Sequence, residues 1–208
     1  MIRGNVRKAF HTVRWRPPAH LPDGPKIFAT NHHGWHDGYL MYIACTALGV
    51  PVVDWIAEFD AFPLFAKVGG MPFPPNDAGR RAATVRKTIR LMKGEGRSLI
   101  LFAEGVLHRP PELMPFGRSL ELVAEKTGAA VIPVAIRYEI AMHERPEPFL
   151  LFGSPVEPGP KLSERSRLAV RKLLDEGAML IRHDEDSLQT LVQGTKDVNE
   201  RFKWPTVR

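Results

Sequence analysis

Cysteine is nearly absent from this sequence, whose 208 residues contain one, Cys45. A single thiol excludes a disulfide framework and any zinc site built from several cysteines. Cys45 lies in an apolar stretch, YLMYIACTAL, and this setting favours a buried structural thiol over a reactive nucleophile. The low cysteine content is also typical of a protein from a reducing compartment.

The sequence also lacks a long hydrophobic run and a recognisable signal peptide. Its longest apolar stretch, residues 39–57, is interrupted by Gly49, Pro51 and Asp54, whereas a membrane-spanning helix needs about 20 consecutive apolar residues. The first residues contain no apolar core followed by a small-residue cleavage site. We therefore predict a cytoplasmic protein that contacts a membrane only peripherally, at its cytoplasmic face.

Acidic residues are missing from the start of the chain, where Asp23 is the first. Over the whole sequence, 29 Lys and Arg face 23 Asp and Glu, a net charge of +6 that favours polyanionic partners such as an anionic membrane or coenzyme A. No nucleic-acid-binding motif accompanies this charge, so we predict no nucleic-acid partner.

The basic N-terminal segment has apolar residues at helical spacing, namely Ile2, Val6, Phe10 and Val13. Residues 1–16 are therefore predicted to form a basic amphipathic helix, which Pro17 ends. Two interpretations are open. The apolar side chains insert into a membrane interface, or they pack on the domain and leave a solvated basic face.

Strands alternate with helices along the rest of the chain, which predicts a single α/β domain with a mostly parallel sheet flanked by helices. We expect a catalytic core over residues 26–153 and a C-terminal helical segment over residues 163–208. The expected strands are 26–30, 52–57, 71–73, 98–102, 131–138 and 149–152, and the expected helices are 38–48, 61–68, 78–92, 117–126 and 163–182.

The segment Thr30-Asn31-His32-His33-Gly34-Trp35-His36-Asp37 directly follows the first of these strands. Loops at the carboxyl ends of parallel strands are where α/β proteins bind ligands. If Asp37 begins the next helix, its carboxylate can fold back onto the imidazole of His32 and fix the ring's tautomer. His32 is then a candidate base for a substrate hydroxyl.

Two other interpretations of this loop are open. Its histidines can be ordinary surface residues. Alternatively, His32, His33, His36 and Asp37 can be the ligands of a metallo-hydrolase, because imidazole and carboxylate suit zinc.

The motif Asn31-His32-x4-Asp37 resembles that of the glycerolipid acyltransferases typified by bacterial 1-acylglycerol-3-phosphate acyltransferase. Three further segments match that family in order. Phe65 to Phe73 precedes Arg80 and Arg81, Phe102-Ala103-Glu104-Gly105-Val106-Leu107-His108 resembles Phe-Pro-Glu-Gly-Thr-Arg-Ser, and residues 131–136 form an apolar strand with an internal proline.

The resemblance implies an O-acyltransferase that needs no metal or other cofactor, with acyl-CoA or acyl carrier protein as the acyl donor and a lysophospholipid or related lipid as the acceptor at a membrane surface. It implies catalytic roles for His32 as base and Asp37 as its orienting partner. The residues implied to bind substrate are Asn31, Gly70, Arg80, Arg81, Glu104, Gly105 and Arg109.

One position departs from the family pattern in a way that bears on the acceptor. The arginine of the third segment, suited to gripping a phosphate, is Leu107 here, and the preceding threonine is Val106. Arg109, Arg80 or Arg81 could replace it, or the acceptor carries no phosphate there. Outside the enzymes, a catalytically inactive membrane-surface binding module is the alternative function.

Overall fold

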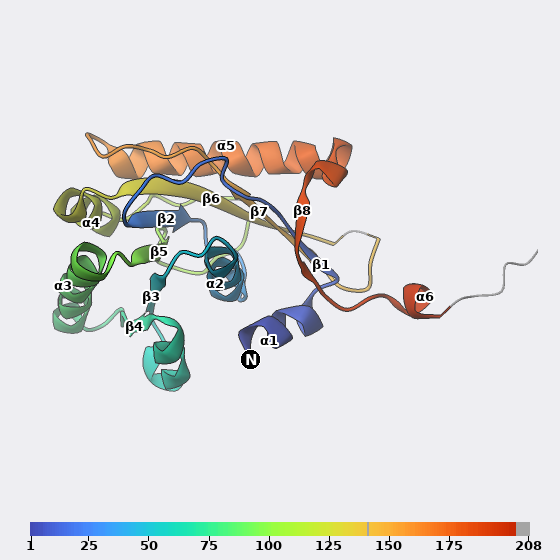
Figure 1. Ribbon diagram of the computed structural model, residues 1–208, viewed down its shortest axis with the longest axis horizontal. Helices are drawn as coiled ribbons and strands as arrows, with labels where there is room; N and C mark the ends of the chain where they lie inside the picture. The colour runs from blue at the N-terminus through green and yellow to red at the C-terminus, as the bar shows by residue number, and fades with distance from the viewer. Residues whose placement is uncertain (141, 203–208) are drawn as a thin grey trace, which may run out of the picture.

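The computed structural model describes every residue except Ala141 and residues 203–208. In the described part, eight strands form one sheet in the order β4-β3-β5-β2-β6-β7-β1-β8 (Figure 1). The strands are β1 (Thr12–Arg16), β2 (Lys26–Thr30), β3 (Val52–Ile56), β4 (Gly70–Pro72), β5 (Ser98–Phe102), β6 (Ala130–Glu139), β7 (Glu147–Phe152) and β8 (Gln189–Gln193).

The five strands from β4 to β6 in that order run parallel, and β7 turns back antiparallel to β6. Consecutive side chains of β2 point to opposite faces of the sheet, so Ile27 and Phe28 enter different cores. All five residues of β2 are buried, as expected for a central parallel strand covered on both sides.

Helices cover both faces of the sheet (Figure 1). On one face lie α3 (Ala78–Glu95), α4 (Ser119–Thr127) and α5 (Leu162–His183), which share a core with Ile27 and Leu99. On the other face, α1 (Ile2–Ala9) and α2 (Asp37–Ala47) pack over Phe28 and Ile100. The predicted α/β fold with a mostly parallel sheet and an N-terminal helix is confirmed.

The predicted N-terminal helix of residues 1–16 is too long. The helix ends at Ala9, and Thr12–Arg16 form β1, which pairs with β7 and β8. The apolar positions of TVRWR fit a strand as well as one face of a helix. The segment is a strand because it pairs with both β7 and β8. The apolar residues Ile2, Val6 and Phe10 are buried against the domain, so α1 presents only its basic face outward.

The predicted C-terminal helical segment, residues 163–208, is only partly helical. Helix α5 ends at His183, and a 3₁₀ turn, η3 (Glu185–Ser187), leads into β8, which pairs antiparallel with β1 at the edge of the sheet. A short helix, α6 (Val198–Arg201), follows, and the last part of the prediction, 203–208, lies outside the described residues. The helix predicted for residues 61–68 is also different in the structure, where Pro63–Val68 form the 3₁₀ segment η2.

In the part of the chain that the structure describes, no helix has both the length and the apolar character that crossing a bilayer requires.

Asp54 of β3 gives the fold a predictable pH dependence. Burial raises the pKa of Asp54 to about 7, and its Oδ1 has no hydrogen-bond partner among the described residues. The folded state therefore holds this proton up to about neutral pH, and its stability falls as the pH rises from about 4, the ordinary pKa of aspartate, through about 7.

Replacing Asp54 with asparagine removes this ionisation. We expect Asp54→Asn to raise Tm by roughly 5 °C at pH 8 and to leave it nearly unchanged at pH 4. Thermal melts of both proteins at the two pH values measure this difference. An equal shift at both pH values would show that ionisation of Asp54 is not its cause.

Candidate active site

The histidine-rich loop leaves the carboxyl end of β2, between β5 and β6. Asn31 fixes its start, because its side chain accepts from the backbone N–H of Ile136 at 2.8 Å and donates to the carbonyl of the same residue at 2.9 Å. Asn31 is completely buried. Asn31 thus holds the loop against β6, and its contact with substrate stays a prediction.

Asp37 is the first residue of α2, and its side chain is completely buried. Its Oδ2 accepts the backbone N–H groups of His33 and Gly34, both at 2.9 Å, and lies 3.0 Å from Nδ1 of His32. Its Oδ1 accepts the Tyr138 hydroxyl at 2.5 Å. These donors hold the carboxylate in one orientation at a helix N-terminus, where negative charge is favoured.

The orientation of Asp37 determines the tautomer of His32. An ionised carboxylate only accepts hydrogen bonds, so Nδ1 of His32 carries the proton and Nε2 presents its lone pair. Among the described residues, Nε2 has no hydrogen-bond partner. The ring stacks on Phe102 at a centroid distance of 4.3 Å, and 23% of the side chain is exposed, so a substrate can reach it.

Glu104, at the carboxyl end of β5, connects that strand's loop to the loop of His32. Its Oε1 accepts the backbone N–H of His32 at 2.8 Å, and its Oε2 accepts the N–H of Met114 and Nε2 of His108, both at 2.6 Å. The side chain is completely buried. These contacts suit a positioning role for Glu104, and its contact with substrate stays a prediction.

His33 and His108 flank Glu104, an arrangement that the sequence pattern alone did not predict. The i,i+4 spacing of Glu104 and His108 was the available signal. Burial lowers the pKa of His33, and the nearby Glu104 charge offsets only part of this effect. Burial also lowers the pKa of His108, but the hydrogen bond and charge of Glu104 outweigh it, and the net pKa is raised.

Comparison with known proteins identifies the family of this chain. A family model described as Acyltransferase matches residues 12–137, more than half of the chain. The chain belongs to the acyltransferase family. The matched region contains β1 through β5 and most of β6, and with them His32, Asp37 and Glu104.

Among its acyltransferase relatives is the chloroplastic 1-acyl-sn-glycerol-3-phosphate acyltransferase LPAT1 of Arabidopsis thaliana, 25% identical over 138 residues, which cover 61% of this chain and 36% of that protein. The chloroplastic 1-acyl-sn-glycerol-3-phosphate acyltransferase BAT2 of Brassica napus is 25% identical over 123 residues, covering 55% and 33%. The chain thus spans about a third of the length of these curated relatives.

A solved structure has a similar fold, that of the 1-acyl-sn-glycerophosphate acyltransferase PlsC from Thermotoga maritima. The TM-score is 0.61 at 21% sequence identity, covering 84% of this chain and 74% of that one.

The remaining predicted substrate residues lie in β4, at the start of α3 and in the loop after β5. Gly70 is buried in β4, where a Cβ atom would come within 2.9 Å of Phe65, so glycine permits close packing there, and its substrate contact stays a prediction. Arg80 forms a double ion pair with Asp60 at 2.6 and 2.7 Å. Arg81 donates to the carbonyl of Pro74 at 2.9 Å.

Gly105 and Arg109 lie in the loop after β5. Gly105 adopts a φ of 77°, which favours glycine, and its N–H closes a turn onto the carbonyl of Phe102 at 2.9 Å. The Arg109 side chain is exposed, and its carbonyl lies 3.1 Å from Nδ1 of His108. Gly105 thus shapes the loop that presents Arg109 to solvent.

The four proposed ligands of a metallo-hydrolase do not converge on one point. His36 turns away from the loop and lies 3.0 Å from Oδ1 of Asn5, while His32 and Asp37 contact each other. Among the described residues, the metal-competent groups include His33, Glu104 and His108, but not the set of His32, His33, His36 and Asp37.

Tyr138, just beyond the matched region, supports the dyad from β6. Its hydroxyl donates to Asp37, and its ring lies against Gly34, where an added Cβ atom would come within 2.4 Å of the ring. Burial raises the pKa of Tyr138, so the hydroxyl remains a donor.

We expect Tyr138→Phe to lower kcat about tenfold, because Asp37 loses one donor and part of its fixed orientation. A KM close to that of the native protein is expected, since Tyr138 acts through Asp37. Steady-state kinetics measure both constants, and Tyr42→Phe, in α2, is the matched control. A rise in KM at constant kcat would contradict a positioning role.

Proposed function

We propose that this protein is an O-acyltransferase that moves a fatty acyl group from acyl-CoA or acyl carrier protein to the hydroxyl of a lysophospholipid or related lipid. The observation that carries the proposal is the 3.0 Å contact between Nδ1 of His32 and the buried Asp37, with Nε2 of the ring free of protein partners among the described residues. Family membership and the names of the relatives support it.

The proposed reaction needs no acyl-enzyme. Nε2 of His32 takes the proton of the acceptor hydroxyl while the hydroxyl oxygen attacks the thioester carbonyl. Asp37 stabilises the imidazolium that forms. The tetrahedral intermediate then collapses, the C–S bond breaks, and the imidazolium returns the proton to the departing thiolate, so that an ester and a thiol are released.

A groove beside the loop supports binding of an acyl chain. It has a volume of about 440 Å³ and lies between α1, α2 and the 3₁₀ segments η1 (Phe59–Ala61) and η2. Tyr39 connects the groove to the loop, because its ring lies 5.7 Å from the rings of both His36 and Phe65. The lining is largely apolar: Met1, Ile2, Asn5, Tyr39, Ala61, Phe62, Pro63, Leu64 and Phe65.

The loop after β5 offers a mixed surface for the acceptor. Val106, Leu107 and Met114 are exposed apolar side chains, and Arg109 is an exposed guanidinium beside them. The family's phosphate-binding arginine is Leu107 in this chain. We propose that Arg109 contacts the acceptor headgroup instead. A phosphate or another polar headgroup can satisfy this arrangement.

Arg80 and Arg81 suit the donor better than the acceptor. They follow β4, which is three strand positions from β2, or about 14 Å at the usual strand spacing. The phosphates of acyl-CoA lie far from its thioester, whereas the headgroup of a lysolipid lies close to the reacting hydroxyl. We therefore propose that these arginines bind donor phosphates.

We propose that the protein works peripherally on the cytoplasmic face of a membrane, with the basic face of α1 toward anionic headgroups. Arg3 and Lys8 are exposed on that face. Replacing both with glutamine should weaken binding to phosphatidylglycerol vesicles at low salt about 30-fold, because each cation contributes about 1 kcal/mol near such a surface.

Vesicle cosedimentation measures this change, and the matched control is Arg118→Gln with Lys126→Gln, at the two ends of α4 on the opposite face of the sheet. Equal binding by all three proteins would contradict a membrane role for α1. Substitution is preferable to deleting residues 1–16, because the deletion removes β1 from the sheet.

The experiment that tests the proposed function is an acyl-transfer screen. Purified protein receives labelled acyl-CoA or acyl carrier protein together with lysolipids that carry or lack a phosphate. We expect an esterified product that forms equally in the presence of a chelator. A chelator-sensitive hydrolase would favour the metal alternative, and vesicle binding without thioester cleavage would favour an inactive binding module.

A further inference from the structure

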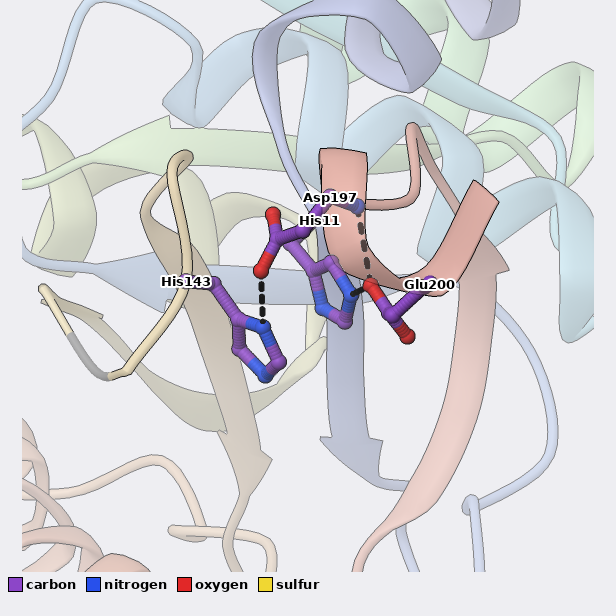
Figure 2. A group of neighbouring side chains, drawn as sticks. All are labelled: His11, His143, Asp197 and Glu200. Atoms are coloured by element: carbon purple, nitrogen blue, oxygen red, sulfur yellow. Dashed lines mark hydrogen bonds and ion pairs between the residues drawn. The ribbon is translucent and has the colours of Figure 1, made fainter. Parts of the chain in front are cut away.

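A second cluster of titratable side chains lies on the same edge of the sheet, at β1, three strand positions from β2. It consists of His11, His143, Asp197 and Glu200, and one ligand atom from each lies within 4.8 Å of all the others (Figure 2). His11 precedes β1, His143 lies between β6 and β7, and the two acids belong to the start of α6. None of these residues contacts the His32–Asp37 pair.

The two imidazoles each face a carboxylate from α6. Nε2 of His11 lies 2.8 Å from Oε2 of Glu200, and Nδ1 of His143 lies 2.7 Å from Oδ2 of Asp197. The rings are stacked, with centroids 3.5 Å apart and planes 9° from parallel. Four donor atoms, two nitrogens and two carboxylate oxygens, thus converge on one small region (Figure 2).

Glu147, at the start of β7, supports the cluster from behind. Its carboxylate is almost completely buried and lies 3.2 Å from Nδ1 of His11 and 4.0 Å from Nε2 of His143. In each ring, the nitrogen near Glu147 is therefore the one that does not contact an acid of α6. Histidines that bind metals usually donate their second nitrogen to such a carboxylate, which fixes the tautomer and leaves the other nitrogen free for the metal.

The two acids of α6 are also held in place by backbone donors. Asp197 accepts the N–H of Glu144 at 3.1 Å, and Glu200 accepts the N–H of Asp197 at 2.8 Å. Three carboxylates, those of Glu147, Asp197 and Glu200, therefore surround two imidazoles. A divalent cation would balance this concentration of negative charge.

We propose that this cluster is a zinc site, with Nε2 of His11, Nδ1 of His143 and one oxygen each from Asp197 and Glu200 as ligands. Two imidazoles and two carboxylates match the donor types and the coordination number of zinc. Bonds of about 2.0 Å in a tetrahedron separate neighbouring ligand atoms by about 3.3 Å. The nitrogen–oxygen distances of the His11–Glu200 and His143–Asp197 pairs, now 2.8 and 2.7 Å, would therefore increase by about half an ångström when zinc binds. The two stacked rings would tilt at the same time.

The proposed zinc would stabilise the fold, because its ligands come from three separate segments. Zinc would join the start of β1, the β6–β7 connection and α6, and so attach the C-terminal part of the chain to the sheet. The single cysteine, Cys45, is buried elsewhere, in α2. Zinc bound by the folded protein is thus not captured by an exposed thiol.

Titration of the metal-free 208-residue chain with zinc chloride tests the proposal. We expect one zinc per chain by calorimetry and elemental analysis, and a Tm rise of about 5 to 10 °C at a free zinc concentration of 100 Kd. Cobalt chloride should give the intense visible absorption of four-coordinate cobalt. Glu147→Gln should weaken zinc binding about 10- to 100-fold by loosening both imidazoles.

His143→Gln and Asp197→Asn should each abolish the stoichiometric binding and the Tm rise, and circular dichroism at low temperature checks that both variants fold. The matched control is His108→Gln, which alters the other metal-competent group found in the described residues, His33, Glu104 and His108. It should retain the zinc. Absence of stoichiometric binding by the native protein, or zinc lost from His108→Gln but kept by His143→Gln, would overturn the proposal.

Discussion

Replacing His32 with alanine is expected to lower kcat for acyl transfer by about 100- to 10,000-fold, because the acceptor hydroxyl loses its general base. The fold should survive, since Asp37 keeps the N–H groups of His33 and Gly34 and the hydroxyl of Tyr138 as donors. We expect the free energy of unfolding to change by no more than about 1 kcal/mol. Acyl transfer and thermal melts of the same preparation measure the two effects.

The matched control for this prediction is His20→Ala, which removes an exposed histidine outside the loop. That variant should retain the activity of the native protein. If His32→Ala transferred acyl groups at the native rate, the assignment of His32 as the base would be wrong. A loss of activity accompanied by unfolding would instead identify a structural role for the ring.

Replacing Asp37 with asparagine is the second change with a large expected effect. An amide oxygen in the place of Oδ2 can still accept from His32, His33 and Gly34, and the Tyr138 hydroxyl can rotate to accept from the amide nitrogen. The geometry is thus preserved while the negative charge is lost. We expect kcat to fall by about 100- to 10,000-fold, because the imidazolium is no longer stabilised.

The stability cost of Asp37→Asn should be moderate, about 1 to 3 kcal/mol, because hydrogen bonds to a charged acceptor become hydrogen bonds to a neutral one. Urea unfolding and acyl-transfer kinetics measure the two consequences separately. Asp23→Asn, at an exposed loop position, is the control. Near-native turnover in Asp37→Asn would mean that His32 works without a charged partner.

The sequence predicted the parts of this protein that depend on local patterns. Residues 26–30 and 98–102 read as buried strands and are β2 and β5 with the expected bounds. The loop after β2 was recognised because polar residues directly follow a buried strand, and the contact between His32 and Asp37 follows from Asp37 beginning a helix.

The contacts between distant segments were beyond sequence reasoning. Strands β1 and β8 were not predicted, because each depends on pairing with a partner more than 100 residues away. The same holds for Tyr138, which reaches Asp37 from β6, and for the pairing of His143 with Asp197. The three donors to Glu104, from His32, His108 and Met114, likewise become visible only in the structure.

Nitrogen-15 NMR of labelled histidine in the resting protein at neutral pH, with His32 assigned by comparison with His32→Ala, tests the central claim most directly. The buried Asp37 should hold the proton on Nδ1 of His32 and leave Nε2 unprotonated, a pattern that Asp37→Asn should weaken. A proton on Nε2 with Nδ1 bare, or a metal ion bound at Nε2, would contradict the account, because Nε2, the nitrogen that does not face Asp37, would then have no free lone pair to take the proton of the acceptor hydroxyl.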